Sequence, residues 1–430
     1  MSLSKLLPCL LLLGACGTQE GDQGAARAKQ NSAVSSRRAP EDRNSRSVVA
    51  ATPAARVAAS SAPTVPGAEQ TFAEVLRLIE TQYVDSGLSR DQLWSGAIEG
   101  MLDRLVKTPG IKVNTLLDPA RLSEMKAGLK GSFSGIGVVI KKFGEVVFVA
   151  EVLPGGPADR AGLRKDDRML EIDGKTVKGL DISQMVQRIR GPGGTTVKLF
   201  VQRETREWTL PVVRGQVTLD AVSGALLPPS VGYIRITSFK ETSLPQLDQL
   251  VDRLTRQGAR AMVLDLRGCP GGLLDVSIGV ADRFLPPGQR VVSIRRRDGR
   301  EQVHTARADN PADRLPVIVL VGKGTASGAE IVAAALADND RATVIGQRTL
   351  GKGTVEEILQ LGNSWALKLS VARFYSPRGQ ALQGRGVVPD FAVVADGAAA
   401  RSYFAAPDPA ALARDPQVTA ALEVLRLGKR

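Results

Sequence analysis

Short apolar segments that alternate with helical ones constrain this chain more than any other feature. AMVLDL (261–266) and PVIVLVG (316–322) are almost wholly apolar, as strands buried on both faces are. LPQLDQLVDRLTRQG (244–258) and SGAEIVAAALADN (327–339) have the length and spacing of helices. Residues 215–395 are therefore predicted to form an α/β core with mainly parallel strands, in which sites form at the carboxyl ends of the strands.

The rest of this region adds strands of another kind. Residues 291–306 form two polar-apolar runs around an Asp-Gly turn, which predicts a hairpin. EEILQL (356–361) and WALKLSVARFYS (365–376) are two more expected strands. Residues 396–430 return to Ala- and Pro-rich sequence before a final short helix, and are expected to be a C-terminal extension.

The N-terminus has the pattern of an export signal. Lys5 precedes the apolar run LLPCLLLLGA, which is too short to span a bilayer. The run ends in Leu13-Gly14-Ala15-Cys16, which resembles a bacterial lipobox. We expect residues 1–16 to be a lipoprotein signal, with Cys16 carrying a lipid in the cell envelope, facing the periplasm or the exterior. The alternative is an ordinary signal peptide in which Cys16 occurs by chance.

Residues 17–70 contain no aromatic residue and are rich in Ala, Ser, Arg, Pro and Gln. Such a segment cannot bury enough surface to fold, so it is predicted to be a disordered tether. A coil of about 54 residues has a root-mean-square reach of roughly 40 Å. Residues 71–127 then show helical spacing, most clearly in FAEVLRLIETQYV and DQLWSGAIEGMLDRL, and are expected to be a small N-terminal helical region.

From Ser132 the period of the pattern changes from that of helices to that of strands. GGPADRAGL followed by DRMLEIDG resembles a PDZ domain of the bacterial protease type, over residues 128–214. The segment Gly135-Ile136-Gly137-Val138 matches the loop that binds a peptide's terminal carboxylate. There, glycines let successive N–H groups turn toward an anion, and the adjoining strand pairs with the peptide. The alternative is a glycine turn in a plain β-domain.

Composition excludes several classes of function. The net charge is +13, but the arginines are scattered, aromatic residues make up 4%, and no nucleic-acid motif is present. With one histidine and three cysteines, a metal site and a Ser-His-Asp triad lack residues. His304 lies on the arginine-rich hairpin and is expected at the surface. No phosphate loop or other cofactor motif is found, so no cofactor is expected.

A serine without histidine needs another base. Ser327 in GKGTASGAEI lies among small residues at the start of a helix, and Lys352 lies between two glycines in RTLGKGTVEE. A lysine amine acts as a base once it has lost its proton, which burial favours. The alternative for Ser327 is structural, because Ser-Gly-Ala-Glu also fits a capping box in which Glu330 reaches back.

Four further segments carry a family resemblance. GYIRITSF, LDLRGCPGG, TASGAEIVAAALADNDRATVIGQRTLGKGTVE and FYSPRGQALQGRGVVPD resemble blocks of the carboxyl-terminal processing (tail-specific) serine proteases, over about residues 71–395. The resemblance implies a multidomain α/β fold with a crotonase/ClpP-like protease core. It also implies Ser327 as nucleophile, Lys352 as base, and an oxyanion hole formed by Gly271 or Gly272 together with Gly328.

Two residues depart from the family pattern. Glu356 stands where the family has glutamine, and an ionised carboxylate beside Lys352 would favour the ammonium form. Glu356 must then be protonated, point elsewhere, or hold the resting enzyme inactive. Cys269 stands beside the oxyanion loop where asparagine is common. After loss of the signal it would be the only free cysteine, so no intramolecular disulfide is expected.

The sequence therefore predicts an exported, membrane-tethered serine endopeptidase that recognises protein C-terminal tails through its PDZ domain. A catalytically silent PDZ scaffold that binds the same tails is the alternative, and Glu356 is its best support. Nucleic acid is not expected as a partner. An adaptor or activator protein is compatible with both functions, and the sequence leaves the oligomeric state open.

Overall fold

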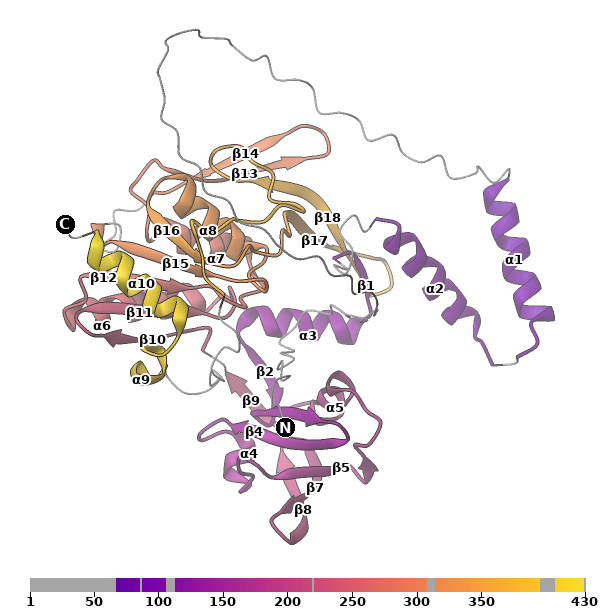
Figure 1. Ribbon diagram of the computed structural model, residues 1–430. Coiled ribbons are helices and arrows are strands. Elements are labelled where there is room, and N and C mark those ends of the chain that lie inside the picture. Colours follow the sequence, from indigo (N-terminus) through magenta and orange to yellow (C-terminus); the bar gives the residue numbers. More distant parts are fainter. Residues whose placement is uncertain are drawn as a thin grey trace, which may run out of the picture. The chain divides into compact units, whose positions relative to one another are not determined.

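The computed structural model describes residues 67–85, 87–105, 113–218, 220–307, 314–394 and 407–428 (Figure 1). These residues fall into two units, which divide between Met101 and Leu102. The expected signal at residues 1–16, with Cys16, and nearly all of the expected tether lie outside the described residues. Within the described part of the chain, no helix has both the length and the apolar character needed to cross a bilayer.

The smaller unit holds two helices, as the sequence predicts. They are α1 (Ala68–Gln82), which begins a little before the expected boundary at residue 71, and α2 (Arg90–Asp103). The helices meet through the rings of Phe72 and Trp94, whose centroids are 5.2 Å apart. Leu76 is the one residue of α1 that is buried, so this pair has little core of its own.

The segment that follows belongs to the larger unit. It contains β1 (Thr115–Leu117) and α3 (Pro119–Lys130), and β1 pairs antiparallel with a strand some 250 residues later, β18 (Ala366–Tyr375). The Asp118 side chain caps α3 by accepting the Arg121 N–H at 2.8 Å. The boundary expected at residue 127 therefore does not coincide with the division of the chain, because residues from Leu102 onward pack with the later part.

The expected PDZ region forms a six-stranded antiparallel sheet with two short helices. Its order is β3-β4-β5-β7-β8, with β6 paired to β5. The elements are β3 (Val138–Phe143), β4 (Val146–Val152), α4 (Pro157–Arg160), β5 (Arg168–Ile172), β6 (Lys175–Thr176), α5 (Ile182–Ile189), β7 (Thr196–Arg203) and β8 (Arg206–Val213). Leu199, Val201 and Met185 are fully buried in its own hydrophobic core. The chain enters and leaves through a two-stranded ribbon, β2 (Ser132–Gly135) with β9 (Gly215–Thr218).

The α/β core is built on a six-stranded sheet in the order β10-β11-β12-β15-β16-β19. All neighbours are parallel except β10 and β11, which confirms the predicted mainly parallel pairing. The strands are β10 (Val222–Leu227), β11 (Val231–Ile236), β12 (Ala261–Asp265), β15 (Val317–Val321), β16 (Ala342–Gly346) and β19 (Phe391–Ala392). A second, antiparallel sheet contains β1, β18, β13 (Arg290–Arg296) and β14 (Glu301–Thr305), with β17 (Thr354–Gln360) paired to β18.

Helices cover both faces of the parallel sheet (Figure 1). One face packs against α6 (Ser243–Arg256), α7 (Leu274–Asp282) and α8 (Gly328–Asp338), and β12 contributes Met262 and Leu264 there. The other face, to which β12 contributes Val263, packs against α10 (Pro416–Leu427), which follows the short helix α9 (Pro409–Leu412). The final helix predicted from the sequence is therefore present, and it covers one face of the parallel sheet.

A matched pair of leucines tests this core. Leu264 is fully buried on β12, so Leu264→Ala should lower the free energy of unfolding by about 2–5 kcal/mol. Leu361 is 41% exposed, and the same change there should cost no more than about 0.5 kcal/mol. Calorimetric unfolding of the full chain measures both, and equal shifts would contradict the assigned core.

Candidate active site

Three neighbouring strands of the parallel sheet carry the predicted site at their carboxyl ends. Residues 268–272 follow β12, Ser327 follows β15, and Lys352 follows β16. Because these strands are adjacent and parallel, their following loops meet at one edge of the sheet. The fold thus brings the predicted nucleophile, base and oxyanion loop to the same place.

Ser327 has a strained backbone. Its φ is 56° and its ψ is −121°, a combination that residues with a side chain rarely adopt. Strain of this kind costs about 1–3 kcal/mol and is found most often at functional sites. The conformation turns the chain sharply from the loop after β15 into α8.

Only one of the two hydrogen bonds of a capping box is formed at Ser327. The Ser327 N–H donates to Glu330 Oε2 at 2.8 Å, as a capping box requires. The Ser327 side chain also approaches the Glu330 N–H in a capping-box arrangement, but that N–H donates to the backbone carbonyl of Ser327 at 2.8 Å, and the side-chain contact falls short of a hydrogen bond. The side chain that would carry out nucleophilic attack is therefore not used in capping the helix.

Glu330 also binds the segment that carries Lys352. The Lys352 N–H donates to Glu330 Oε2 at 2.8 Å, which is the oxygen that accepts from Ser327. Its other oxygen, Oε1, accepts from the Gly351 N–H at 2.7 Å and from Thr349 Oγ1 at 2.5 Å. One carboxyl group thus fixes the backbone of both predicted catalytic residues, with their nitrogens within two hydrogen-bond lengths of each other.

Glu330 is fully buried on α8. Burial raises the pKa of this carboxyl above its usual value, and the four donors from Thr349, Gly351, Ser327 and Lys352 oppose that rise. Each donor needs an acceptor, since an unsatisfied buried N–H costs about 1–3 kcal/mol. From its sequence pattern, Glu330 is expected only to cap α8. Its second role has no local sequence signal, because residues 349–352 follow another strand.

The Lys352 side chain contacts Glu356. Its Nζ lies 2.8 Å from Glu356 Oε2, and the two side chains are 17% and 11% exposed. Thr354 Oγ1 donates to the other oxygen, Glu356 Oε1, at 2.7 Å. Of the three alternatives for Glu356, the one in which it points elsewhere is therefore wrong.

The glycine loop packs directly against Ser327. The Ala326 N–H donates to the Cys269 carbonyl at 2.9 Å. A Cβ at position 271 would lie 2.8 Å from Gly328 N and 2.9 Å from Ser327 Cβ, and one at position 272 would lie 2.1 Å from the Phe239 carbonyl oxygen. Both positions have positive φ, of 97° and 153°. Only glycine lets the loop approach the nucleophile this closely.

Backbone donors are available beside Ser327. Among the described residues, no acceptor lies within hydrogen-bonding range of the Gly272 and Gly328 N–H groups. Gly328 is the first residue of α8, where unpaired N–H groups favour negative charge. Burial raises the pKa of the Cys269 thiol to about 12, and the Gly271 N–H, which is directed at that sulfur, opposes the rise. Gly272 is therefore the better oxyanion donor of the two that the sequence offered.

The predicted carboxylate loop of the PDZ domain has free donors too. The Ile136 and Gly137 N–H groups have no acceptor in the described part of the chain, and Gly137 has φ of 76°. Val138 begins β3, whose outer edge is not paired within its sheet.

His304, expected at the surface, is half-buried on β14, and burial lowers its pKa.

Two family models match the chain. The model described as "Peptidase family S41" matches residues 230–393, and the model described as "PDZ domain" matches residues 148–203. The first covers the parallel sheet with Ser327 and Lys352, and the second lies within the antiparallel sheet that follows α3.

Several proteins that are similar to this chain are named as carboxy-terminal processing proteases. The Carboxy-terminal-processing protease of Bartonella bacilliformis is 35% identical over 75% of this chain and 74% of its own length. The Carboxy-terminal processing protease CtpA of Bacillus subtilis is 34% identical over 70% of this chain, which spans 63% of the length of that protein. A solved structure, the photosystem II D1 C-terminal processing protease, aligns with 76% of this chain and 93% of its own at 29% identity, with a TM-score of 0.46.

The resemblance seen in the sequence is thereby confirmed, both in the blocks around the predicted site and in the PDZ region. The chain belongs to peptidase family S41, as a PDZ-containing member of the carboxy-terminal processing proteases.

Proposed function

We propose that this protein is an exported, membrane-tethered serine endopeptidase that binds C-terminal tails in its PDZ domain and cleaves them with Ser327 and Lys352. One observation carries the proposal: a single buried oxygen, Glu330 Oε2, accepts the N–H groups of both residues. Such a shared acceptor fixes two loops relative to each other. Fixed geometry between nucleophile and base is what nucleophilic catalysis requires.

The reaction would follow from this geometry. Ser327 Oγ attacks the peptide carbonyl carbon while the Lys352 amine takes the hydroxyl proton, and the carbonyl oxygen becomes an oxyanion. The Gly272 and Gly328 N–H groups would donate to that oxyanion, each lowering the barrier by about 3 kcal/mol. Lys352 returns the proton to the leaving amine, and water then hydrolyses the acyl-enzyme by the same route.

The contact between Lys352 and Glu356 opposes the first step. The Lys352 Nζ donates a hydrogen bond to Glu356 Oε2 at 2.8 Å, whereas the first step needs this nitrogen as an acceptor. We therefore propose that this pairing belongs to a resting state with low activity. Release of Glu356, or its protonation, would give the active form, and an adaptor or activator protein would have this contact as its target.

The PDZ region would supply the tail-binding step. A peptide can add as a strand to the free edge of β3, with its carboxylate on the Ile136 and Gly137 N–H groups. Half-buried Val138, Ile182 and Val186 line the adjoining region between β3 and α5, which favours an apolar last residue. Cleavage would then occur upstream in a tail loose enough to reach Ser327.

The envelope location rests on the sequence. The export signal and the lipobox at Cys16 support a lipid anchor, and residues 17–70 have the composition of a tether. An enzyme held in this way would act on tails within reach of its membrane.

A catalytically silent PDZ scaffold is the second candidate, and the contact between Lys352 and Glu356 favours it. The two functions share tail binding and differ in turnover. The scaffold predicts that binding occurs without cleavage under all conditions.

Removal of the nucleophile separates the two. Wild type should cleave disordered β-casein, and Ser327→Ala should lower the rate by at least about 1,000-fold, since a Ser-dyad enzyme loses its covalent route. Ser364 is an exposed serine that also has positive φ, 65°, so Ser364→Ala is the matched control and should keep full activity. Equal cleavage by wild type and Ser327→Ala, or none by either, would reject the proposed enzyme.

Glu356→Gln should retain or raise kcat/KM at neutral pH, by up to about tenfold, because a neutral amide removes the carboxylate charge that lies 2.8 Å from the Lys352 amine. Glu357 is the next residue on β17 and pairs with Arg296 at 2.5 Å, so Glu357→Gln is the control and should change little. Steady-state kinetics on a quenched peptide cut by wild type give the result. A large fall in kcat for Glu356→Gln alone would show that the carboxylate takes part in the reaction.

Glu330→Gln should lower kcat by about 100-fold or more, because an amide has one accepting oxygen where the carboxylate has two, so that either the Ser327 and Lys352 N–H groups or the Gly351 N–H lose their acceptor. The same change should also cost about 1–3 kcal/mol of stability, from the donors left unsatisfied. Glu423, exposed on α10, provides the control Glu423→Gln. A wild-type kcat in Glu330→Gln would mean that the site does not depend on this anchor.

A further inference from the structure

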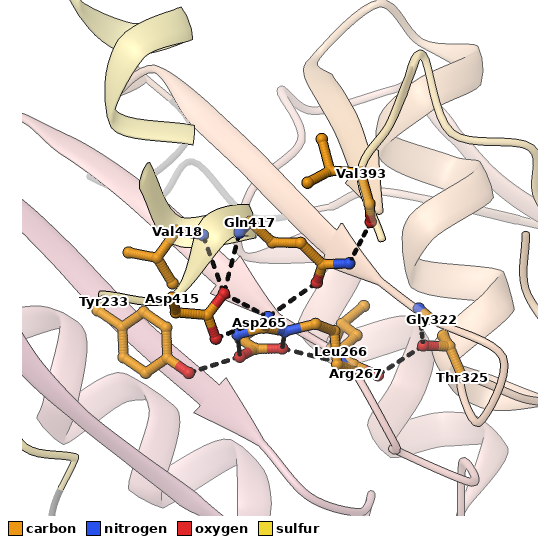
Figure 2. A network of polar contacts seen from close by, with 10 residues as sticks. All are labelled: Tyr233, Asp265, Leu266, Arg267, Gly322, Thr325, Val393, Asp415, Gln417 and Val418. Atoms are coloured by element: carbon orange, nitrogen blue, oxygen red, sulfur yellow. Dashed lines mark hydrogen bonds and ion pairs between the residues drawn. The ribbon is translucent and has the colours of Figure 1, made fainter. Parts of the chain in front are cut away.

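The end of β12 is tied to the C-terminal segment by a buried polar cluster (Figure 2). Arg267 lies two residues after β12 and its side chain is 8% exposed. Its Nη1 donates to Asp415 Oδ1 at 2.9 Å and to Gln417 Oε1 at 2.8 Å, at the start of α10. The family model ends at residue 393, before either of these acceptors.

Arg267 is held from β12 as well. Its Nε and Nη2 donate to the two oxygens of Asp265, at 2.9 and 2.7 Å, and Tyr233 Oη donates to Asp265 Oδ2 at 2.5 Å. Burial lowers the pKa of Arg267, but Asp265 and Asp415 outweigh this effect, so that the pKa lies above its usual range. A guanidinium whose N–H groups are bound by two carboxylates and an amide is restricted to one orientation. Arg267 with Asp265, Asp415 and Gln417 therefore forms a rigid connection between β12 and α10, which we call the C-terminal joint.

The backbone of Arg267 belongs to the segment that forms one side of the candidate site. Leu266, the residue before Arg267, accepts through its carbonyl from Thr325 Oγ1 at 2.8 Å. Cys269, two residues after it, accepts from the Ala326 N–H at 2.9 Å. Thr325 and Ala326 lead directly into Ser327, and Gly271 packs against it. A change in the position of Arg267 would therefore shift the oxyanion loop relative to the nucleophile.

We propose that Asp415 and Gln417 are positioning residues for the active site: by holding the Arg267 guanidinium, the C-terminal helix fixes the 268–272 loop against Ser327. This role rests on the proposed function. It makes the C-terminal segment part of the catalytic apparatus, through contacts that lie on the face of the sheet covered by α10.

The chain contains a close control for Asp415. Asp408 and Asp415 both precede a proline and both cap a helix, with φ of −77° at each. Asp408 accepts the Ala410 and Ala411 N–H groups, whereas Asp415 accepts those of Gln417 and Val418 and also binds Arg267. Asparagine is an equally good cap residue, so Asp→Asn keeps the cap at both sites and removes a charge from Arg267 at one.

The experiment uses the full chain and three variants: Asp415→Asn, Asp408→Asn, and Asp415→Asn combined with Gln417→Glu. The double variant moves the carboxylate to the other acceptor of Arg267 Nη1, and it gives up the hydrogen bond that Gln417 Nε2 donates to the Val393 carbonyl at 2.6 Å. We expect Asp415→Asn to lower kcat on the quenched peptide by about 10- to 100-fold with little change in KM, since small misplacements cost this much. Asp408→Asn should match wild type, and the double variant should recover most of the lost kcat.

Hydrogen exchange gives a readout that needs no activity. Amides of residues 266–273 should exchange faster in Asp415→Asn than in wild type, and return toward wild type in the double variant. Thermal unfolding identifies the temperature range in which every variant is fully folded, and both measurements are made there. The proposal is overturned if the exchange of 266–273 is unchanged, if Asp408→Asn has the same effect, or if kcat follows the folded fraction alone. An inactive wild type with the expected exchange pattern would reject the proposed function and leave the positioning role supported.

Discussion

The candidate site depends on one buried carboxyl group, that of Glu330. It lies on α8, which follows β15, yet three of the four groups it binds, at Thr349, Gly351 and Lys352, belong to the loop after β16. A carboxyl group with no exposure is costly unless its oxygens are saturated, and here four donors saturate both. The same contacts that make Glu330 tolerable in the core thus define the distance between the Ser327 and Lys352 backbones. Stability and catalytic geometry are two consequences of one set of hydrogen bonds.

Much of the core could be predicted because its signals are local. Apolar runs such as 261–266 and 316–322 can be buried on both faces only in a covered parallel sheet, and adjacent parallel strands bring Ser327 and Lys352 to one edge. Other features had no local signal. The pairing of β1 with β18 joins segments about 250 residues apart, and the packing of α10 fills a sheet face whose need for cover is visible only once the strands are assembled. The Glu330 side chain belongs to the same class, because its capping pattern hides its contacts with a different loop.

Glu356, which stands where the family has glutamine, is the residue whose contacts conflict with the proposed reaction. A core optimised for proton abstraction would not leave a carboxylate on the base, whereas Glu356 contacts Lys352 and is itself held by Thr354. The arrangement is favourable as an ion pair and unfavourable as a catalytic dyad. In the proposed function this contact would act as a conformational brake, which a partner or substrate that separates the pair would release.

The brake and the C-terminal joint act on opposite sides of Ser327. In the proposed enzyme, Glu356 would control the base Lys352, in the loop after β16, and Arg267 with Asp415 would support the oxyanion loop, after β12. Ser327 follows β15, the strand between these two, so its reactivity would depend on both neighbouring loops. In the proposed enzyme, the oxyanion loop would stay fixed while the base alone is switched. The fixed part would be held from α10, outside residues 230–393 that the family model matches, and the switch would be one carboxylate within them.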